Sequence, residues 1–403
     1  MTAFIGMQAQ ARDERAWIGT WMASPQPLWE ADFPLPTNVP FTIWDQTVRM
    51  VARVSLGGRQ VRATLCNEYG TRPLRIGDAQ IALARGGGAT VSGSQRQLTF
   101  GGKTTASIPP GAKVISDPVD LEIASLTDVA ISLYLPEPNA LSTFHWDGRQ
   151  TAYIGAGNQV SADAIRDATT FDARVFLSEI LVSATDEART VVTVGDSITD
   201  GNGSTPNTNS RWPDFLAERL ASRNVAVLNA GISGARLLQN RMGDNALARF
   251  ERDVLSQPGM KTVIVLLGIN DISWPGSVFA PDVPKARAED LIGAYRQLIA
   301  WAKIHRVRII GATLTPFEGA LEGTPIKGYF SSEKDRIRQD VNAWIRTSGE
   351  FDAVIDFDRV TQDPRRPGQL LSEYDSGDRL HPGDDGYRAM AEAIDLPTLL
   401  GAP

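Results

Sequence analysis

The chain changes character at residues 190–200, which read TVVTVGDSITD. The first part of this stretch is apolar without alternation, and such runs are typical of a parallel strand whose two faces are both covered by helices. Gly, Asp and Ser then interrupt the run, as expected for a turn that leads from a strand into a helix. The pattern predicts a buried strand with polar side chains at its carboxyl end.

Strand and helix patterns continue to alternate from this point to the C-terminus. The predicted strands are the apolar, β-branched runs 190–194, 225–229, 262–267, 308–313 and 353–357. The predicted helices are the amphipathic windows 212–223, 246–256, 286–304, 332–347 and 383–394. Repetition of this kind predicts an open α/β fold with a parallel sheet.

The chain before residue 185 has the pattern of an all-β domain. Residues 47–56 alternate apolar and polar side chains, Gly57 and Gly58 give a hairpin signal, and residues 61–66 resume the alternation. Similar short runs lie at 74–84, 97–100, 119–123, 129–135, 151–154 and 175–183. Many short strands separated by turns predict a β-sandwich or jelly roll.

We therefore expect three segments, with a domain boundary in the polar stretch 185–189. Residues 1–16 form an N-terminal extension or leader remnant, 17–185 the β-sandwich domain, and 186–403 the α/β domain. Ala9, Gln10 and Ala11 have the small-x-small pattern of a signal-peptidase site, which favours a secreted or periplasmic protein with a trimmed leader. A basic n-region and a longer apolar core are missing, and this favours an ordinary terminus and a cytoplasmic location.

Composition excludes several classes of protein. The 403 residues are 42% hydrophobic and 22% charged, close to globular averages. The net charge of −7 leaves no basic excess for nucleic acid or an anionic membrane. The longest apolar run, 263–267, is far shorter than the roughly 20 residues of a membrane span. Cys66 is the only cysteine and only three histidines occur, so the sequence predicts no disulfide and no metal site.

Polar and glycine residues gather at four places in the predicted α/β domain. They are Gly195-Asp196-Ser197, residues 229–234, residues 268–271 and residues 378–382. Each segment follows a predicted strand or precedes a predicted helix, and each alone is an ordinary turn or helix cap. Ligands of open parallel sheets bind at the carboxyl ends of the strands. The four segments together therefore indicate a functional site at one edge of the sheet.

The four segments resemble the four sequence blocks of the SGNH (GDSL) hydrolases, in the usual order, from about residue 190 to residue 396. The resemblance implies that Ser197 is the nucleophile, that Gly234 belongs to the second block and Asn270 to the third, and that Asp378 and His381 belong to the last. The third block reads Gly-Ile-Asn-Asp instead of the commoner Gly-Gly-Asn-Asp, which leaves the asparagine in place. The implied fold is a flavodoxin-like α/β/α sandwich that holds the whole active site.

The chemistry of these residue types supports the same assignment. A serine hydroxyl needs a base, and the neutral imidazole of His381 can take its proton near pH 7. Asp378 can accept the other ring N–H, fix the tautomer and stabilise the imidazolium. The backbone N–H groups of Ser197 and Gly234 and the side-chain amide of Asn270 can serve as oxyanion donors.

The expected activity is ester hydrolysis through an acyl-serine intermediate, with no metal and no organic cofactor. The expected substrates are acylated, in particular acetylated, carbohydrates or small aryl and alkyl esters. Two alternatives remain open: a lysophospholipase or thioesterase that acts on lipids, and a non-catalytic carbohydrate-binding protein.

A few further residues are candidates for a role near the site. Trp274 lies on a loop just after the third block and is a candidate wall of the substrate pocket. Asp196 and Asp200 are expected to shape the nucleophile loop. His145 lies in a polar and aromatic segment that could reach the active site, although a plain sandwich loop is the simpler interpretation. The Gly- and Pro-rich stretch 317–330 could form another wall or a lid.

Overall fold

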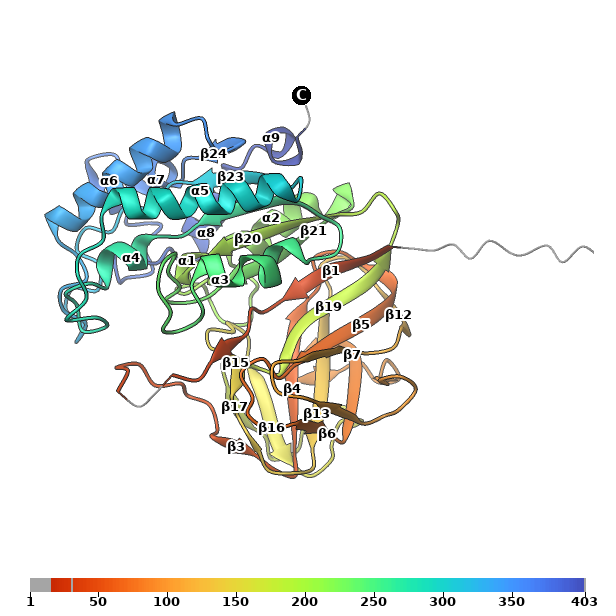
Figure 1. The fold of residues 1–403 in the computed structure, drawn as a ribbon. Helices are drawn as coiled ribbons and strands as arrows, with labels where there is room; N and C mark the ends of the chain where they lie inside the picture. Colours follow the sequence, from red (N-terminus) through yellow and green to blue (C-terminus); the bar gives the residue numbers. More distant parts are fainter. Residues whose placement is uncertain (1–15, 30–31, 402–403) are drawn as a thin grey trace, which may run out of the picture.

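The computed structural model describes residues 16–29 and 32–401, which form a strand-rich N-terminal part and a helix-rich C-terminal part (Figure 1). Of the predicted extension or leader remnant, residues 1–16, residues 1–15 lie outside the described residues, and Ala16 begins the first strand, β1 (Ala16–Met22). Strand β19 ends the first part at Ala184, and β20 begins the second at Arg189. No helix of the described residues is long and apolar enough to span a bilayer.

Two antiparallel sheets dominate the N-terminal part. The first contains β1 (Ala16–Met22), β5 (Gly58–Cys66), β11 (Lys113–Ile115), β12 (Val119–Ile123) and β19 (Leu177–Ala184). The second contains β4 (Gln46–Arg53), β7 (Asp78–Gly86), β8 (Ala89–Thr90), β9 (Arg96–Gln97), β13 (Asp128–Leu135), β16 (Ala152–Ala156) and β17 (Thr169–Phe171). Apolar side chains from both sheets form one buried cluster, and β12 shows the alternation that makes this possible, since its odd-numbered residues are buried and its even-numbered ones exposed.

Short strand pairs complete the N-terminal part. They are β6 (Leu74–Ile76) with β10 (Ala106–Ile108), β3 (Thr42–Ile43) with β14 (Asn139–Ala140), and β15 (Thr143–His145) between β2 (Gln26–Pro27) and β18 (Arg174–Val175). Two runs that the sequence predicts as single strands are each divided. Residues 74–84 break at Gly77, and residues 175–183 break at Phe176, whose φ of 60° lies outside the β region.

The C-terminal part is built on a parallel sheet in the order β21 (Val225–Gly231), β20 (Arg189–Gly195), β22 (Met260–Leu266), β23 (Arg308–Ala312) and β24 (Ala353–Ile355). In chain order these strands run 2-1-3-4-5. The longer helices are α2 (Trp212–Leu220), α5 (Ala288–Ile304), α6 (Ser332–Thr347) and α8 (Asp384–Glu392). Helices α5 and α6 pack together, as do α2 and α8.

Shorter elements carry the loops around this sheet. They are α1 (Ser197–Asp200), α3 (Ala246–Phe250), α4 (Ile269–Ser273), α7 (Phe357–Thr361), α9 (Leu396–Leu400) and the hairpin of β25 (Gln362–Asp363) and β26 (Arg366–Leu370). The helix predicted over 246–256 is regular only in α3 and continues as a π-helix over Glu251–Leu255. Of these elements, α1 follows β20 and contains Ser197, and α4 follows β22 and contains Asn270.

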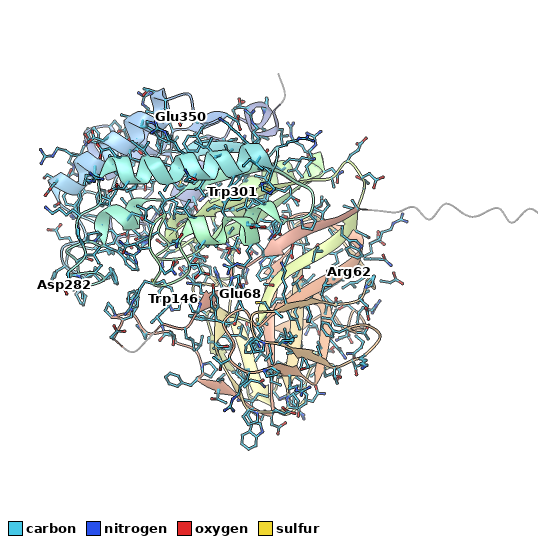
Figure 2. The ribbon with its side chains drawn as sticks, viewed as in Figure 1. Arg62, Glu68, Trp146, Asp282, Trp301 and Glu350 are labelled. Atoms are coloured by element: carbon cyan, nitrogen blue, oxygen red, sulfur yellow. The ribbon has the colours of Figure 1, made fainter. Side chains whose placement is uncertain are left out.

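The two parts are held together by specific hydrogen bonds. Strand β1 contacts β21, and the Val227 N–H donates to Ser55 Oγ at 3.0 Å. The Tyr69 hydroxyl donates to Asp244 at 2.5 Å, and Arg252 pairs with Glu68 at 3.1 Å. Figure 2 shows Glu68 and Trp146 at this junction. The N-terminal part therefore packs against the C-terminal part through β1, Ser55, Glu68 and Tyr69.

Candidate active site

The first three segments singled out in the sequence meet at one edge of the parallel sheet. Gly195, at the end of β20, pairs with Gly231 of β21 on one side and with Leu266 of β22 on the other. The polar segments that follow these strands are therefore neighbours in space. The loop over 378–382 brings the fourth segment to the same edge.

Ser197 is the first residue of helix α1 and is mostly buried. Asp196 caps this helix, because its Oδ1 accepts the Ile198 N–H at 3.1 Å. Burial raises the pKa of Asp196 to about 7, against the opposing effect of that hydrogen bond. Asp196 thus shapes the turn, as its position in the sequence suggested, and the turn presents the Ser197 hydroxyl to the loop that carries the histidine.

Ser197, His381 and Asp378 form a continuous hydrogen-bonded chain. The Ser197 Oγ lies 2.7 Å from His381 Nε2, and His381 Nδ1 lies 2.6 Å from Asp378 Oδ2. The other carboxylate oxygen of Asp378 accepts the backbone N–H groups of Leu380 and His381. Burial alone would raise the pKa of Asp378, but these bonds, the imidazole bond first among them, lower it to about 2. Because the carboxylate is charged, Nδ1 carries a proton and a neutral ring leaves Nε2 free to accept the serine proton.

Asn270 lies in helix α4 with its amide oriented by two partners. Its Nδ2 donates to Ala235 O at 3.1 Å, and its Oδ1 accepts the Tyr329 hydroxyl at 2.8 Å. Since an amide nitrogen has two hydrogens, one N–H has no acceptor among the described residues and remains for a ligand. Asp271, the next residue, accepts the backbone N–H groups of Leu237 and Leu238 and so ties α4 to the loop after β21.

Gly234, on that same loop, occupies a place that only glycine fits. Its φ is 76°, in the left-handed region. A Cβ at this position would lie 2.3 Å from Met242 Sδ and 3.0 Å from the Trp274 ring. The tight fit brings the backbone of Gly234 close to the side chains that surround Ser197.

A cavity of about 210 Å³ opens beside Ser197 and His381. Trp274 forms part of its wall, with its ring stacked on Phe279 at 4.9 Å between centroids. Leu35 and Trp146 come from the β domain, so both domains contribute to this cavity. Its other large side chains are mainly apolar and are Met242, Leu321, Ile326, Tyr329 and Leu380, while Asn202, Ser233, Gly234, Asn270 and Asp378 complete the lining.

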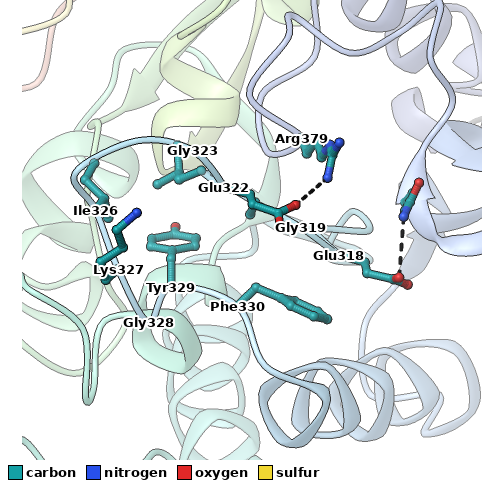
Figure 3. Close-up of a pocket in the computed structure, with 13 residues that line it drawn as sticks. Glu318, Gly319, Glu322, Gly323, Ile326, Lys327, Gly328, Tyr329, Phe330 and Arg379 are labelled. Carbon is teal, nitrogen blue, oxygen red and sulfur yellow. Dashed lines mark hydrogen bonds and ion pairs between the residues drawn. The ribbon is translucent and has the colours of Figure 1, made fainter.

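A second cavity, of about 420 Å³, adjoins the first (Figure 3). Leu321, Ile326 and Tyr329 line both cavities. The second one carries charged and polar groups: Arg379 pairs with Glu322 at 2.6 Å, and the Gln369 amide donates to Glu318 at 3.4 Å. The stretch 317–330, which the sequence suggested as a wall or lid, supplies most of the wall of the second cavity and three lining residues of the first.

Some residues near the site carry no sequence signal for a role there. Leu35 lines the cavity but belongs to no recognisable pattern. Tyr329 lies in the stretch 317–330, which the sequence suggested as a wall or lid, but nothing in that pattern indicated that it orients Asn270. His145 is not in a plain sandwich loop, because its Nε2 lies 2.9 Å from Asp200 of the α/β domain. The aromatic and polar segment around His145 was the one indication of this contact.

Comparison with known proteins places the C-terminal part in a family. The sequence profile described as GDSL-like lipase/acylhydrolase matches residues 191–394. No curated protein matches the chain. Among solved structures, a GDSL-like lipase from Bacteroides thetaiotaomicron VPI-5482 is 20% identical, with 52% of this chain and 87% of that one covered and a TM-score of 0.39. The acetyl xylan esterase AlAXEase is 19% identical (51% and 96% covered, TM-score 0.37), and TesA is 20% identical (52% and 98% covered, TM-score 0.38).

Proposed function

Because the chain belongs to the family of GDSL-like lipases and acylhydrolases, and is therefore a carboxylic ester hydrolase, we propose that Ser197 forms its acyl-enzyme intermediate. The hydrogen-bonded chain from Ser197 through His381 to Asp378 carries this proposal, with distances of 2.7 and 2.6 Å. A serine hydroxyl attacks an ester only when a base removes its proton, and this arrangement supplies the base and its orienting carboxylate.

The reaction proceeds in two stages. The Ser197 Oγ attacks the ester carbonyl while His381 Nε2 takes the hydroxyl proton, and the carbonyl oxygen becomes an oxyanion. The backbone N–H groups of Ser197 and Gly234 and the free amide N–H of Asn270 donate to that oxyanion. The intermediate collapses as His381 returns the proton to the alcohol oxygen, which leaves. Water then attacks the acyl-serine, again with His381 as base, and releases the carboxylic acid.

The two adjoining cavities favour an ester with an apolar acyl group and a hydroxylated alcohol. The apolar cavity beside Ser197 suits an acyl group or a small aryl or alkyl ester. The neighbouring cavity offers the Arg379–Glu322 pair and Glu318 as hydrogen-bonding groups, which suits an alcohol such as a sugar. We therefore propose acylated, including acetylated, carbohydrate as the substrate class.

A lipid substrate is the second candidate, because the lining of the first cavity is mainly apolar. A panel of nitrophenyl esters of increasing chain length, together with acetylated sugars, separates the two. Carbohydrate esters should be cleaved with the higher kcat/KM, and the rate should fall as the acyl chain outgrows the cavity. Rates that rise steadily with chain length would instead support a lysophospholipase or thioesterase.

We also propose a fold type for each of the two parts of the chain. The strand order 2-1-3-4-5 supports a flavodoxin-like α/β/α sandwich over residues 186–403. The two antiparallel sheets around one apolar cluster support a β-sandwich over residues 17–185. A secreted or periplasmic location stays a prediction, since it rests on residues 1–15.

Labelling by a fluorophosphonate tests the assignment of Ser197. Wild-type protein should be labelled at Ser197, and Ser197→Ala should lose both labelling and turnover while its melting temperature stays unchanged. Ser204→Ala serves as the matched control, because Ser204 is a buried serine of the turn that follows helix α1, and among the described residues its hydroxyl bonds only Gly201 O. It should keep both labelling and turnover. Esterase activity in a folded Ser197→Ala protein would refute the nucleophile, and a wild-type protein without labelling would favour a non-catalytic binding role.

A further inference from the structure

His145 of the β domain is buried against the nucleophile helix of the other domain. Its Nε2 lies 2.9 Å from Asp200 Oδ1, and its Nδ1 lies 3.0 Å from Ser24 O. A carboxylate oxygen and a carbonyl oxygen both only accept, so each ring nitrogen must carry a hydrogen, and the ring is an imidazolium. Burial alone would lower the pKa of His145, but the charge and hydrogen bond of Asp200 raise it above its ordinary value.

Asp200 in turn holds Ser233 on the loop after β21. Its Oδ2 accepts the Ser233 backbone N–H at 2.8 Å and the Ser233 hydroxyl at 2.9 Å. Asp200 is the last residue of helix α1, which Ser197 begins, and Ser233 directly precedes Gly234. The carboxylate therefore fixes the distance between the two segments that carry backbone oxyanion donors.

Asp147, two residues after His145, reaches the same loop. Its Oδ2 lies 3.2 Å from the Ser233 hydroxyl and accepts the Asn202 amide at 2.8 Å. Both carboxyl groups contact the Ser233 hydroxyl, and burial first and then the charge of Asp200 raise the pKa of Asp147 to about 6. The positive charges of His145 and of Arg149, 3.7 Å from Asp147 Oδ1, offset this repulsion.

The four side chains of this network are His145, Asp147, Asp200 and Ser233, and all are at most 6% exposed. Buried polar groups that are fully bonded restrict a structure to one arrangement. A shift of about 1 Å in a catalytic group can cost a factor of about 10² in rate. A network that ties the Ser233–Gly234 segment to helix α1 is thus placed to control the oxyanion site.

We propose that His145 and Asp147 are positioning residues, through which the β domain holds the Ser233–Gly234 loop at the spacing from Ser197 that oxyanion binding requires. The proposal rests on the function proposed for Ser197 and extends it, because the active site is then complete only with the β domain docked. The two residues touch no substrate in this account. They act on the transition state through Ser233 and Gly234, so their loss should lower kcat more than it raises KM.

The main test replaces His145 by glutamine, with His305→Gln as the matched control, since His305 is exposed at the C-terminal end of helix α5 and its Nδ1 contacts only Trp301 O among the described residues. For His145→Gln we expect kcat per active site to fall by about 10- to 100-fold, with KM within about twofold. A trifluoromethyl ketone forms an oxyanion with the serine. Its inhibition constant should rise by the same factor by which kcat/KM falls. His305→Gln should change none of these values.

Two further variants keep the test decisive if His145→Gln folds poorly. Asp147→Asn keeps the shape of the side chain, and Ser233→Ala removes the shared hydroxyl. Each should lower kcat in the same way. The double variant His145→Gln/Ser233→Ala should lower kcat by a smaller factor than the product of the two single factors, because both substitutions break one network. Normal kcat per titrated site in all three single variants would overturn the proposal. If instead the fluorophosphonate does not label wild-type protein at Ser197, the proposed nucleophile is wrong.

Discussion

At the scale of single residues, Asn270 is the sharpest test of the oxyanion site. Its amide donates to Ala235 O and accepts from Tyr329, and the remaining N–H is the one assigned to the oxyanion. Because that bond strengthens as the carbonyl oxygen gains charge, Asn270→Ala should lower kcat by about 10²–10³-fold and leave KM nearly unchanged.

Tyr329→Phe provides a graded comparison for this prediction. It removes only the hydroxyl that orients the amide, so it should lower kcat by less than Asn270→Ala does. Steady-state kinetics with active-site titration, together with melting temperatures, measure both effects. If folded Asn270→Ala enzyme keeps kcat within about threefold of wild type, the loss is far smaller than the removal of an oxyanion donor causes, and the oxyanion is bound by other donors.

The residues proposed as catalytic could be found from sequence because each lies in a short local pattern. Ser197, Asn270 and His381 follow strand ends or precede a helix, and strand ends of a parallel sheet converge. For their orienting partners the sequence indicated only candidate segments, the stretch 317–330 that contains Tyr329 and the polar and aromatic segment around His145, and not the contacts themselves. Tyr329 and His145 reach the site through the docking of distant segments, which no local periodicity encodes.

At the scale of secondary-structure elements, strand β19 carries a buried acid that should make stability depend on pH. Burial raises the pKa of Glu179 from 4.5 to about 7, while Lys113 and the hydroxyl of Thr64 oppose the shift. Between these two pH values the folded protein holds a proton that the unfolded chain has lost, so this carboxyl group makes the protein less stable as pH rises. At about 1.4 kcal/mol per pKa unit, the loss is about 3 kcal/mol and is complete above pH 7.

Glu179→Gln should remove this dependence. Relative to wild type, the variant should gain stability as the pH rises from 4.5 to 7 and keep the gain at higher pH. Denaturant unfolding at pH 4, 6 and 8 measures the difference. Glu122→Gln, on the exposed face of β12, is the control and should follow wild type throughout. Parallel curves for Glu179→Gln and wild type would contradict the prediction.

Helix boundaries were predictable where a capping residue marks them. Helix α6 runs over Ser332–Thr347 as its sequence pattern predicts, because Ser331 caps it and Glu333 and Asp335 occupy its first turn. The break of the predicted strand 74–84 at Gly77 and the π-helix after α3 were not predictable. On either side of Gly77 the chain pairs with different strands, β6 with β10 and β7 with β13, and no local pattern records which strand will be the partner.

At the scale of the whole molecule, the apolar core of the β domain continues into the loops around the active site. Trp29 and Phe33 of the N-terminal part contact each other at 5.6 Å between ring centroids. Phe33 also lies 5.8 Å from Trp274 and 5.6 Å from Phe279, which form the cavity wall. Two domains that share buried aromatic contacts of this kind are expected to unfold together.

Phe33→Ala should therefore destabilise the whole molecule. Loss of a buried phenylalanine costs about 3–5 kcal/mol, and the cost should appear as a lower midpoint of one transition in calorimetry. Phe41→Ala is the matched control, because Phe41 is 84% exposed, and its stability should equal that of wild type. Since the Trp274 ring packs on the Gly234 loop, Phe33→Ala should also lower kcat while the protein remains folded. Two separate transitions in the wild type, only one of them shifted by Phe33→Ala, would mean that the domains fold independently and that the shared aromatic contacts do not couple them.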